Sequence, residues 1–185
     1  MSGLIATPGQ TVGPFFGYAL PFPNCSELVP PTREGAVRLH GDVLDGHGQP
    51  VPDAILELWQ AAPDGSVPQQ PGSLKRDGWT FTGWGRASTD DAGHYSFTTL
   101  RPGPTEPGKA PFFAVTVFAR GLLNRLFTRA YLPEDSQTLD GDPLLAALDP
   151  SRRGTLVARA DDQGYVFDVR LQGDSETVFL AYPER

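Results

Sequence analysis

The sequence of 185 residues carries a formal net charge of −7 at pH 7, from 22 acidic and 15 basic side chains. Nucleic acids and anionic membranes bind basic surfaces, so this charge argues against both as partners. The length fits one domain with its own core, and 21 glycines and 19 prolines beside 39% hydrophobic residues indicate many turns between short strands.

Cys25 is the only cysteine, so the chain cannot form an internal disulfide. Its thiol lies in a proline-flanked segment without an obvious base, and we expect a small, partly buried hydrophobic group rather than a nucleophile. The first residues show no charged and apolar leader, and no apolar run reaches the roughly 20 residues that span a bilayer. These features predict a protein of the reducing cytoplasm.

Residues 1–33 are expected to form an extended arm. The segment is rich in proline and has no sustained alternation of apolar and polar residues, so other groups must hold it in place. Its most distinctive stretch is Thr11-Val-Gly-Pro-Phe-Phe16. From the residues alone, this stretch could equally be a loose tail whose two phenylalanines pack onto the domain.

Residues 34–185 are expected to form a single sandwich domain, because strand patterns alternate with Gly-rich turns and no boundary interrupts them. The apolar positions of residues 36–44 lead to the turn Asp45–Pro50 and then to the strand pattern of residues 54–59. In this turn Gly48 can adopt positive φ, and the proline fixes φ at about −65°. The pattern therefore predicts a hairpin.

A second turn, Asp90-Asp-Ala-Gly93, lies between two β-rich runs and has the Asp and Gly of a tight connection. After it, Tyr95, Phe97 and Thr99 occupy alternate positions, as in a strand with one buried face. This region is predicted to be the central hairpin. Further on, Phe112–Ala119 is continuously apolar, which predicts a strand covered on both faces.

The remaining segments add a loop, a helix and three short strands. Residues 61–77 are rich in Pro, Gly, Gln and Asp and are expected to form a long surface loop. Asp142 and Pro143 predict a short helix over residues 142–148, with Asp142 as N-cap, that Asp149-Pro150 ends. Strands are expected over residues 155–160, 165–171 and 177–181, the first two joined as a hairpin. The fold class predicted is an all-β sandwich of about eight strands with one short helix.

The three histidines do not form a metal-site pattern. A His-x-His pair on a strand would place two imidazoles on one side, and the sequence contains none. His40 lies near a strand, whereas His47 and His94 lie in turns and are expected at the surface. A Gly-x-Ser-x-Gly nucleophile motif is also absent.

Arg129 is the charged residue that stands out. In the run Leu126-Phe-Thr-Arg-Ala-Tyr131, strand alternation places it on the same side as Phe127 and Tyr131. A guanidinium among aromatic rings requires a carboxylate or a partner chain if it is buried. The alternative is an arginine on an edge strand that extends its charged end into solvent.

An ordered set of motifs resembles the intradiol ring-cleavage dioxygenases, which are built on a prealbumin-like sandwich. The resemblance extends from Thr7 to Tyr182 and rests on Thr11-Val-Gly-Pro-Phe, Gly41-Asp-Val-Leu-Asp, Ile55-Leu-Glu-Leu-Trp-Gln60, Thr89-Asp-Asp-Ala-Gly-His-Tyr-Ser-Phe97, Arg101-Pro-Gly-Pro104, Phe118-Ala-Arg-Gly121 and Thr128-Arg-Ala-Tyr131. Each turn motif alone is common among such sandwiches, but the ordered set is specific.

Catalytic chains of that family bind ferric iron through two tyrosines and a His-x-His pair, and this sequence departs from the pattern at each position. Thr105 stands where a tyrosine follows the Pro-Gly-Pro run, Phe112 and Ala114 stand at the histidine positions, and the loop tyrosine falls near Ser73. Phenylalanine and alanine have no ligand atoms, and hydroxyls are poor ligands for ferric iron. The resemblance therefore implies an alpha chain without metal, paired with a beta chain that holds the Fe(3+).

The resemblance also implies a substrate and the residues that face it. The complex would cleave 3,4-dihydroxybenzoate with O₂ in a higher hetero-oligomer of alpha and beta chains. Thr11, Gly13 and Pro14 match the arm segment that lines the substrate slot, and Arg129 matches an arginine that faces the substrate region. No residue of this chain is expected to be catalytic.

Two alternatives remain open on the sequence. The chain could be an autonomous intradiol dioxygenase with atypical ligands, or a binding module of the same fold without oxygen chemistry.

Overall fold

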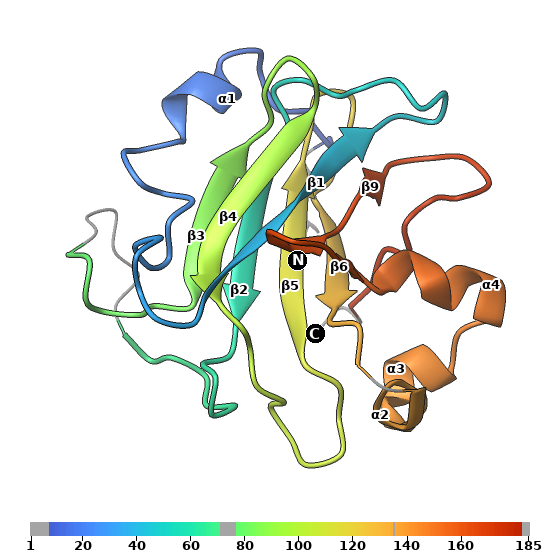
Figure 1. Ribbon diagram of the computed structural model, residues 1–185. Coiled ribbons are helices and arrows are strands. Elements are labelled where there is room, and N and C mark those ends of the chain that lie inside the picture. The colour runs from blue at the N-terminus through green and yellow to red at the C-terminus, as the bar shows by residue number, and fades with distance from the viewer. Residues whose placement is uncertain (1–7, 71–76, 135, 183–185) are drawn as a thin grey trace, which may run out of the picture.

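The computed structural model describes residues 8–70, 77–134 and 136–182, and its strands form two sheets with a shared core (Figure 1). In the first sheet the order is β4-β1-β8-β7, and β9 also pairs with β1. Its strands are β1 (Ala36–Leu44), β4 (His94–Leu100), β7 (Arg159–Ala160), β8 (Gly164–Val166) and β9 (Val169–Arg170). The second sheet has the order β3-β2-β5-β6. Its strands are β2 (Ile55–Gln60), β3 (Trp84–Ser88), β5 (Phe112–Phe118) and β6 (Leu126–Tyr131). The prediction of an all-β sandwich is confirmed.

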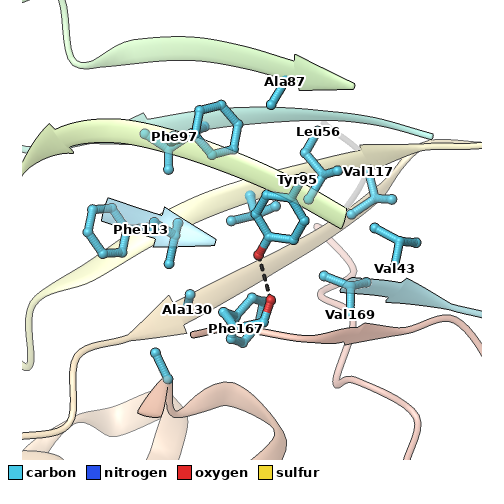
Figure 2. Close-up of a cluster of buried hydrophobic side chains, with 14 of the residues drawn as sticks. Val43, Leu56, Ala87, Tyr95, Phe97, Phe113, Val117, Ala130, Phe167 and Val169 are labelled. Atoms are coloured by element: carbon cyan, nitrogen blue, oxygen red, sulfur yellow. Dashed lines mark hydrogen bonds between the residues drawn. The ribbon is translucent and has the colours of Figure 1, made fainter. Parts of the chain in front are cut away.

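The main core lies between the two sheets (Figure 2). Phe97 from β4 and Phe113 from β5 are fully buried there, and the expected alternation of Tyr95, Phe97 and Thr99 is confirmed because all three are buried. The Tyr95 hydroxyl donates to the carbonyl oxygen of Phe167 at 2.5 Å, so this polar group is satisfied inside the core. Each fully buried side chain of this size contributes about 1.5–3 kcal/mol.

The two main hairpin predictions are wrong, although both turns form. Gly48 and Gly93 adopt the expected positive φ, 75° and 76°. However, β1 and β4 belong to the first sheet, whereas β2 and β3 belong to the second, so each turn leads from one sheet to the other. After the first turn the chain bends again at Asp53, whose φ is 61°, and this second bend directs β2 away from β1.

The C-terminal strand predictions are confirmed in part. β7 and β8 form the expected antiparallel hairpin, but they are shorter than predicted because residues 154–156 form a 3₁₀ turn, η1 (Gly154–Leu156). Residues 177–181 are not a strand. Single hydrogen bonds attach them to the rest of the domain instead; for example, Leu180 N donates to the carbonyl oxygen of Phe127 at 2.7 Å.

Short helices are more numerous than the single one predicted. The described residues contain α1 (Phe16–Ala19), α2 (Ser136–Gly141), α3 (Pro143–Ala146) and α4 (Pro150–Arg153). The expected helix is α3, with Asp142 as N-cap and Pro143 in the first turn, while Asp149-Pro150 both ends this segment and begins α4. None of the described helices is long and apolar enough to cross a bilayer.

The described part of the arm is attached to the domain by residues 22–29. Cys25, Leu28 and Val29 are buried. The Cys25 carbonyl accepts from Arg86 N and the Leu28 amide donates to the Thr98 carbonyl, both at 2.8 Å, so the arm contacts one strand of each sheet. These bonds satisfy strand-edge groups that would otherwise face solvent.

Candidate functional site

The candidate site lies on the outer face of the second sheet. In the pairing of β5 with β6, Phe112 is opposite Tyr131 and Ala114 is opposite Arg129, and Trp59 of β2 is opposite Ala114 on its other side. Alternation along the strands therefore gathers these side chains on the face away from the main core.

This outer face is less covered than the sequence predicts for β5. The inward residues Phe113, Val115 and Val117 are fully buried, as expected, but Phe112 and Ala114 on the outer face are only half-buried. Trp59 beside them remains 50% exposed. The continuous apolar run therefore has one face in the core and one face open to further contacts.

Arg129 is held in a defined position on this face. The carbon at the centre of its guanidinium lies 4.0 Å from the centroid of the Phe112 ring, a cation–π contact. Its Nη1 donates to the phenol oxygen of Tyr131 at 3.0 Å. Among the described residues no carboxylate forms an ion pair with it, so its positive charge is oriented but not neutralised by direct contact.

Tyr131 connects Arg129 to the cap of α3. The Tyr131 hydroxyl donates to Asp142 Oδ1 at 3.1 Å, and the same oxygen accepts from the amides of Leu144 and Leu145. Burial raises the pKa of Tyr131 to about 12, an effect that Asp142 strengthens and Arg129 opposes. The phenol therefore stays protonated at neutral pH and keeps its donor for the buried carboxylate.

A small apolar cavity lies next to these residues. It has a volume of about 170 Å³, and its lining includes Trp59, Val67, Pro68, Thr105, Phe112 and Ala114. Thr105, Phe112 and Ala114, three of the four positions predicted to match iron ligands, thus lie around one cavity; the fourth, near Ser73, lies outside the described residues.

The residues around this cavity do not fit a ferric ion. Phe112 and Ala114 offer no ligand atom, and the Thr105 hydroxyl is a weak donor to ferric iron. Across the described parts of the chain, His, Cys, Asp and Glu side chains form no group of three or more that could hold a metal. The donor set on this face is suited to anion binding by Arg129, not to metal binding.

The arm residues of the predicted site lie elsewhere. The Thr11 hydroxyl accepts from the amide of Gly121 at 2.7 Å, which docks the arm on the turn between β5 and β6. Gly13 and Pro14 are exposed, and a Cβ at Gly13 would meet no atom within 4 Å. Arg129 lies roughly 10 Å further along β6 than the first residue of that strand, so within this chain the arm and Arg129 do not form one pocket.

Two histidines form carboxylate pairs on the first sheet. His40 Nε2 lies 3.0 Å from Asp161 Oδ2, and His94 Nδ1 lies 2.9 Å from Asp42 Oδ1. His94 was expected in a turn but begins β4, where it is opposite Asp42. The His40 and His94 rings are 5.5 Å apart, yet each uses its own carboxylate, which accounts for both as structural residues.

Sequence reasoning missed the roles of Tyr131 and Asp142. Asp142 carried a clear N-cap signal, but nothing in the sequence indicates that its carboxylate also accepts from a tyrosine eleven positions earlier. A shared face for Arg129 and Tyr131 was visible in the alternation of the strand. That alternation was the one sequence signal for this network.

Comparison with known proteins identifies relatives over nearly the whole chain. Residues 30–173 match a family described as "Dioxygenase". The protocatechuate 3,4-dioxygenase alpha chain of Burkholderia cepacia is 38% identical over 97% of this chain and 99% of the relative. The beta chain of protocatechuate 3,4-dioxygenase from the same organism is 33% identical over 74% of this chain and 64% of that relative.

Solved structures agree on the fold. A hydroxyquinol 1,2-dioxygenase from Pseudomonas putida DLL-E4 superposes with a TM-score of 0.61 at 20% identity, over 89% of this chain and 66% of that one. The chain therefore belongs to the dioxygenase family and is a homologue of protocatechuate 3,4-dioxygenase alpha chains.

Proposed function

We propose that this chain is the subunit of a protocatechuate 3,4-dioxygenase that does not bind iron, and that it completes the substrate pocket of a beta chain that holds the Fe(3+). The observation that carries the proposal is the replacement of the ligand positions by Thr105, Phe112 and Ala114 in a chain otherwise similar to alpha chains over 97% of its length. The reaction of the complex would cleave 3,4-dihydroxybenzoate with O₂ to 3-carboxy-cis,cis-muconate.

Arg129 would attract and orient the carboxylate of the substrate. Its guanidinium is fixed by Phe112 and Tyr131 and has no carboxylate partner in the described chain. A positioned guanidinium binds a carboxylate by charge-assisted hydrogen bonds, which are stronger than neutral ones. Its contribution is to binding and orientation, because no bond to Arg129 forms or breaks.

Thr11, Gly13 and Pro14 would line the slot of the partner chain. The Thr11 hydroxyl anchors the segment at Gly121, and the exposed backbone at Gly13 has open space where a side chain would be. Glycine allows the backbone to come close to a flat aromatic ring, and proline makes this approach rigid. The arm would thus form part of the wall of a substrate pocket that belongs to the partner chain.

The proposed partner surface is supported by exposed aromatic side chains. Phe15 and Tyr18 on the arm are 74% and 82% exposed, and Trp59 is half exposed on the outer sheet face. Large aromatic residues of this kind are enriched where protein chains meet. We assign them to contact with the beta chain in a higher hetero-oligomer, and we place the complex in the cytoplasm on the evidence of the single, buried Cys25.

Expression with and without the beta chain tests this proposal. We expect co-expression to give a stable complex that turns over 3,4-dihydroxybenzoate, whereas the chain alone gives no turnover and aggregates through its exposed aromatic surface. Turnover by the isolated chain would instead support an autonomous dioxygenase. A stable monomer that does not bind the beta chain would instead indicate that the protein is a binding module.

A further inference from the structure

The lining of a second cavity includes residues of α4 and β9, two elements that lie on the same side of the sandwich (Figure 1). Its volume is about 260 Å³, and it shares no lining residue with the apolar cavity beside Phe112. The charged lining residues are Arg159, Asp168 and Arg170, and the hydroxyl groups come from Ser151, Thr155, Ser175 and Thr177. In contrast to the first cavity, this one is polar and contains two guanidinium groups.

Arg170 is placed toward the cavity by the short strand β9. Its neighbour Val169 is fully buried in the main core, so alternation directs Arg170 to the opposite side. The backbone there is fixed, because Arg170 N donates to the Thr177 hydroxyl at 2.9 Å and its carbonyl accepts from Thr177 N at 3.0 Å. Within the described residues its guanidinium makes no hydrogen bond or ion pair.

Asp168 is the single acidic residue of the lining, and both of its carboxylate oxygens already have hydrogen-bond partners within the protein. Its Oδ1 accepts from the amide of Asp42 at 3.1 Å, and its Oδ2 pairs with Arg159 Nη2 at 3.1 Å. The carboxylate therefore balances Arg159 and leaves the charge of Arg170 without a partner. The lining has a net charge of one positive unit, from two arginines and one aspartate, in a protein of charge −7.

The hydroxyl groups of the lining divide into used and available donors. Thr155 donates to the Arg152 carbonyl and Ser151 donates to Asp149, so both protons are used. Thr177 accepts from Arg170 N, but in the described structure neither its hydroxyl nor that of Ser175 donates. The hydroxyl protons of Ser175 and Thr177 and the guanidinium of Arg170 therefore remain available as donors to a ligand in the cavity.

A third arginine, Arg152, lies close in sequence to residues that line the cavity. Arg152 lies in α4, between the lining residues Ser151 and Gly154, and its Nη2 donates to the Glu176 carbonyl at 3.2 Å. Its Nε is buried and has no hydrogen-bond partner among the residues that the structure describes. Such an unbalanced buried donor is stabilised by a nearby negative charge.

We propose that this cavity binds a small oxyanion, a carboxylate or phosphate group, through Arg170 and Arg159. Two guanidinium groups and two available hydroxyls supply charge-assisted hydrogen bonds to such an anion. The site is distinct from the Arg129 face, so it would exist whether or not the chain is part of a dioxygenase.

Thermal unfolding of the purified protein, with its beta chain where the two co-purify, tests the site. Inorganic phosphate and succinate are the two probes, each titrated at constant ionic strength against NaCl so that general salt effects cancel. A ligand of the folded state raises the melting temperature with increasing concentration. We expect a saturable increase with at least one probe, and the probe with the lower midpoint identifies phosphate or carboxylate as the preferred group.

Arginine substitutions decide whether the increase comes from this cavity. Arg170→Gln is expected to raise the midpoint concentration at least tenfold, as the loss of charged hydrogen bonds implies. Arg159→Gln, at a side chain that is 72% exposed, is expected to weaken binding without affecting folding. Arg33→Gln, at an exposed arginine outside the cavity, should match the wild type. The proposal is wrong if neither probe differs from NaCl, or if all three variants respond as the wild type does.

Discussion

Arg129 and Tyr131 lie two positions apart on one face of β6, and Arg129 Nη1 donates to the Tyr131 hydroxyl at 3.0 Å. The hydroxyl in turn donates to the buried carboxylate of Asp142, at the cap of α3. The position of the guanidinium therefore depends on a phenol and a helix cap, both of which can be altered without touching the charge itself.

Removal of the Arg129 charge should weaken substrate binding in the assembled enzyme. We expect Arg129→Ala to raise the KM for 3,4-dihydroxybenzoate by roughly tenfold or more, because a hydrogen bond to a charged group contributes about 1.5–3 kcal/mol, and to leave the iron content unchanged. Steady-state kinetics and metal analysis measure the two effects. The matched control is Arg125→Ala, which removes a similar contact with the ring of Phe127. A fall in iron content at constant KM would refute the role given to Arg129.

Removal of the Tyr131 hydroxyl should affect stability and KM together. Tyr131→Phe leaves Asp142 without one donor and frees Arg129, so we expect a loss of about 1–3 kcal/mol in unfolding free energy and a raised KM with little change in kcat. Tyr95→Phe is the control, because it removes the hydroxyl of another fully buried tyrosine, whose bond goes to Phe167. It should lower stability and leave KM unchanged. Equal KM values in the two variants would show that Tyr131 has only a structural role.

The two helix caps should differ in their contribution to stability. Asp142 is buried and accepts three hydrogen bonds, whereas Asp149 is exposed and caps α4 with Ser151 as its partner. Loss of an ordinary cap costs about 0.5–2 kcal/mol, and an unsatisfied buried donor adds about 1–3 kcal/mol. We therefore expect Asp142→Ala to destabilise more than Asp149→Ala in urea unfolding. A larger effect at Asp149 would contradict the network.

Substitution at Gly13 tests the arm. A Cβ there meets no atom of this chain within 4 Å, so Gly13→Val should fold and assemble normally. We expect it to lower kcat/KM in the complex by closing the slot of the partner, with a smaller effect for Gly13→Ala. Size-exclusion chromatography checks assembly and kinetics check the slot. Unchanged turnover by the valine variant would show that the arm does not line the substrate slot.

Local signals predicted the turns, one helix and the pairing of β7 with β8, but not how the strands beside the first two turns pair. Gly48 and Gly93 adopt the positive φ that their turns require, and Asp142 caps α3 as its sequence indicates. Whether the strands beside a turn pair with each other depends on later contacts across the core. No sequence pattern predicts the bend at Asp53. Because of this bend, the expected hairpin is instead a connection between two sheets.

The candidate site could be predicted from the sequence only along single strands. Alternation correctly placed Arg129 beside Tyr131, because that relation depends on two neighbouring positions. The contact of Arg129 with Phe112 depends on the register of β5 with β6, and the bond from Tyr131 to Asp142 depends on the position of α3. Both are properties of the folded chain and have no local signature.

The central claim is that this chain cannot hold the iron that its family uses. The most direct measurement is the iron content of the chain purified without a beta chain after refolding or expression with excess iron. The account predicts far less than one iron per chain and no visible absorption band from tyrosine bound to ferric iron. One tightly bound iron per chain, with that band present, would contradict it.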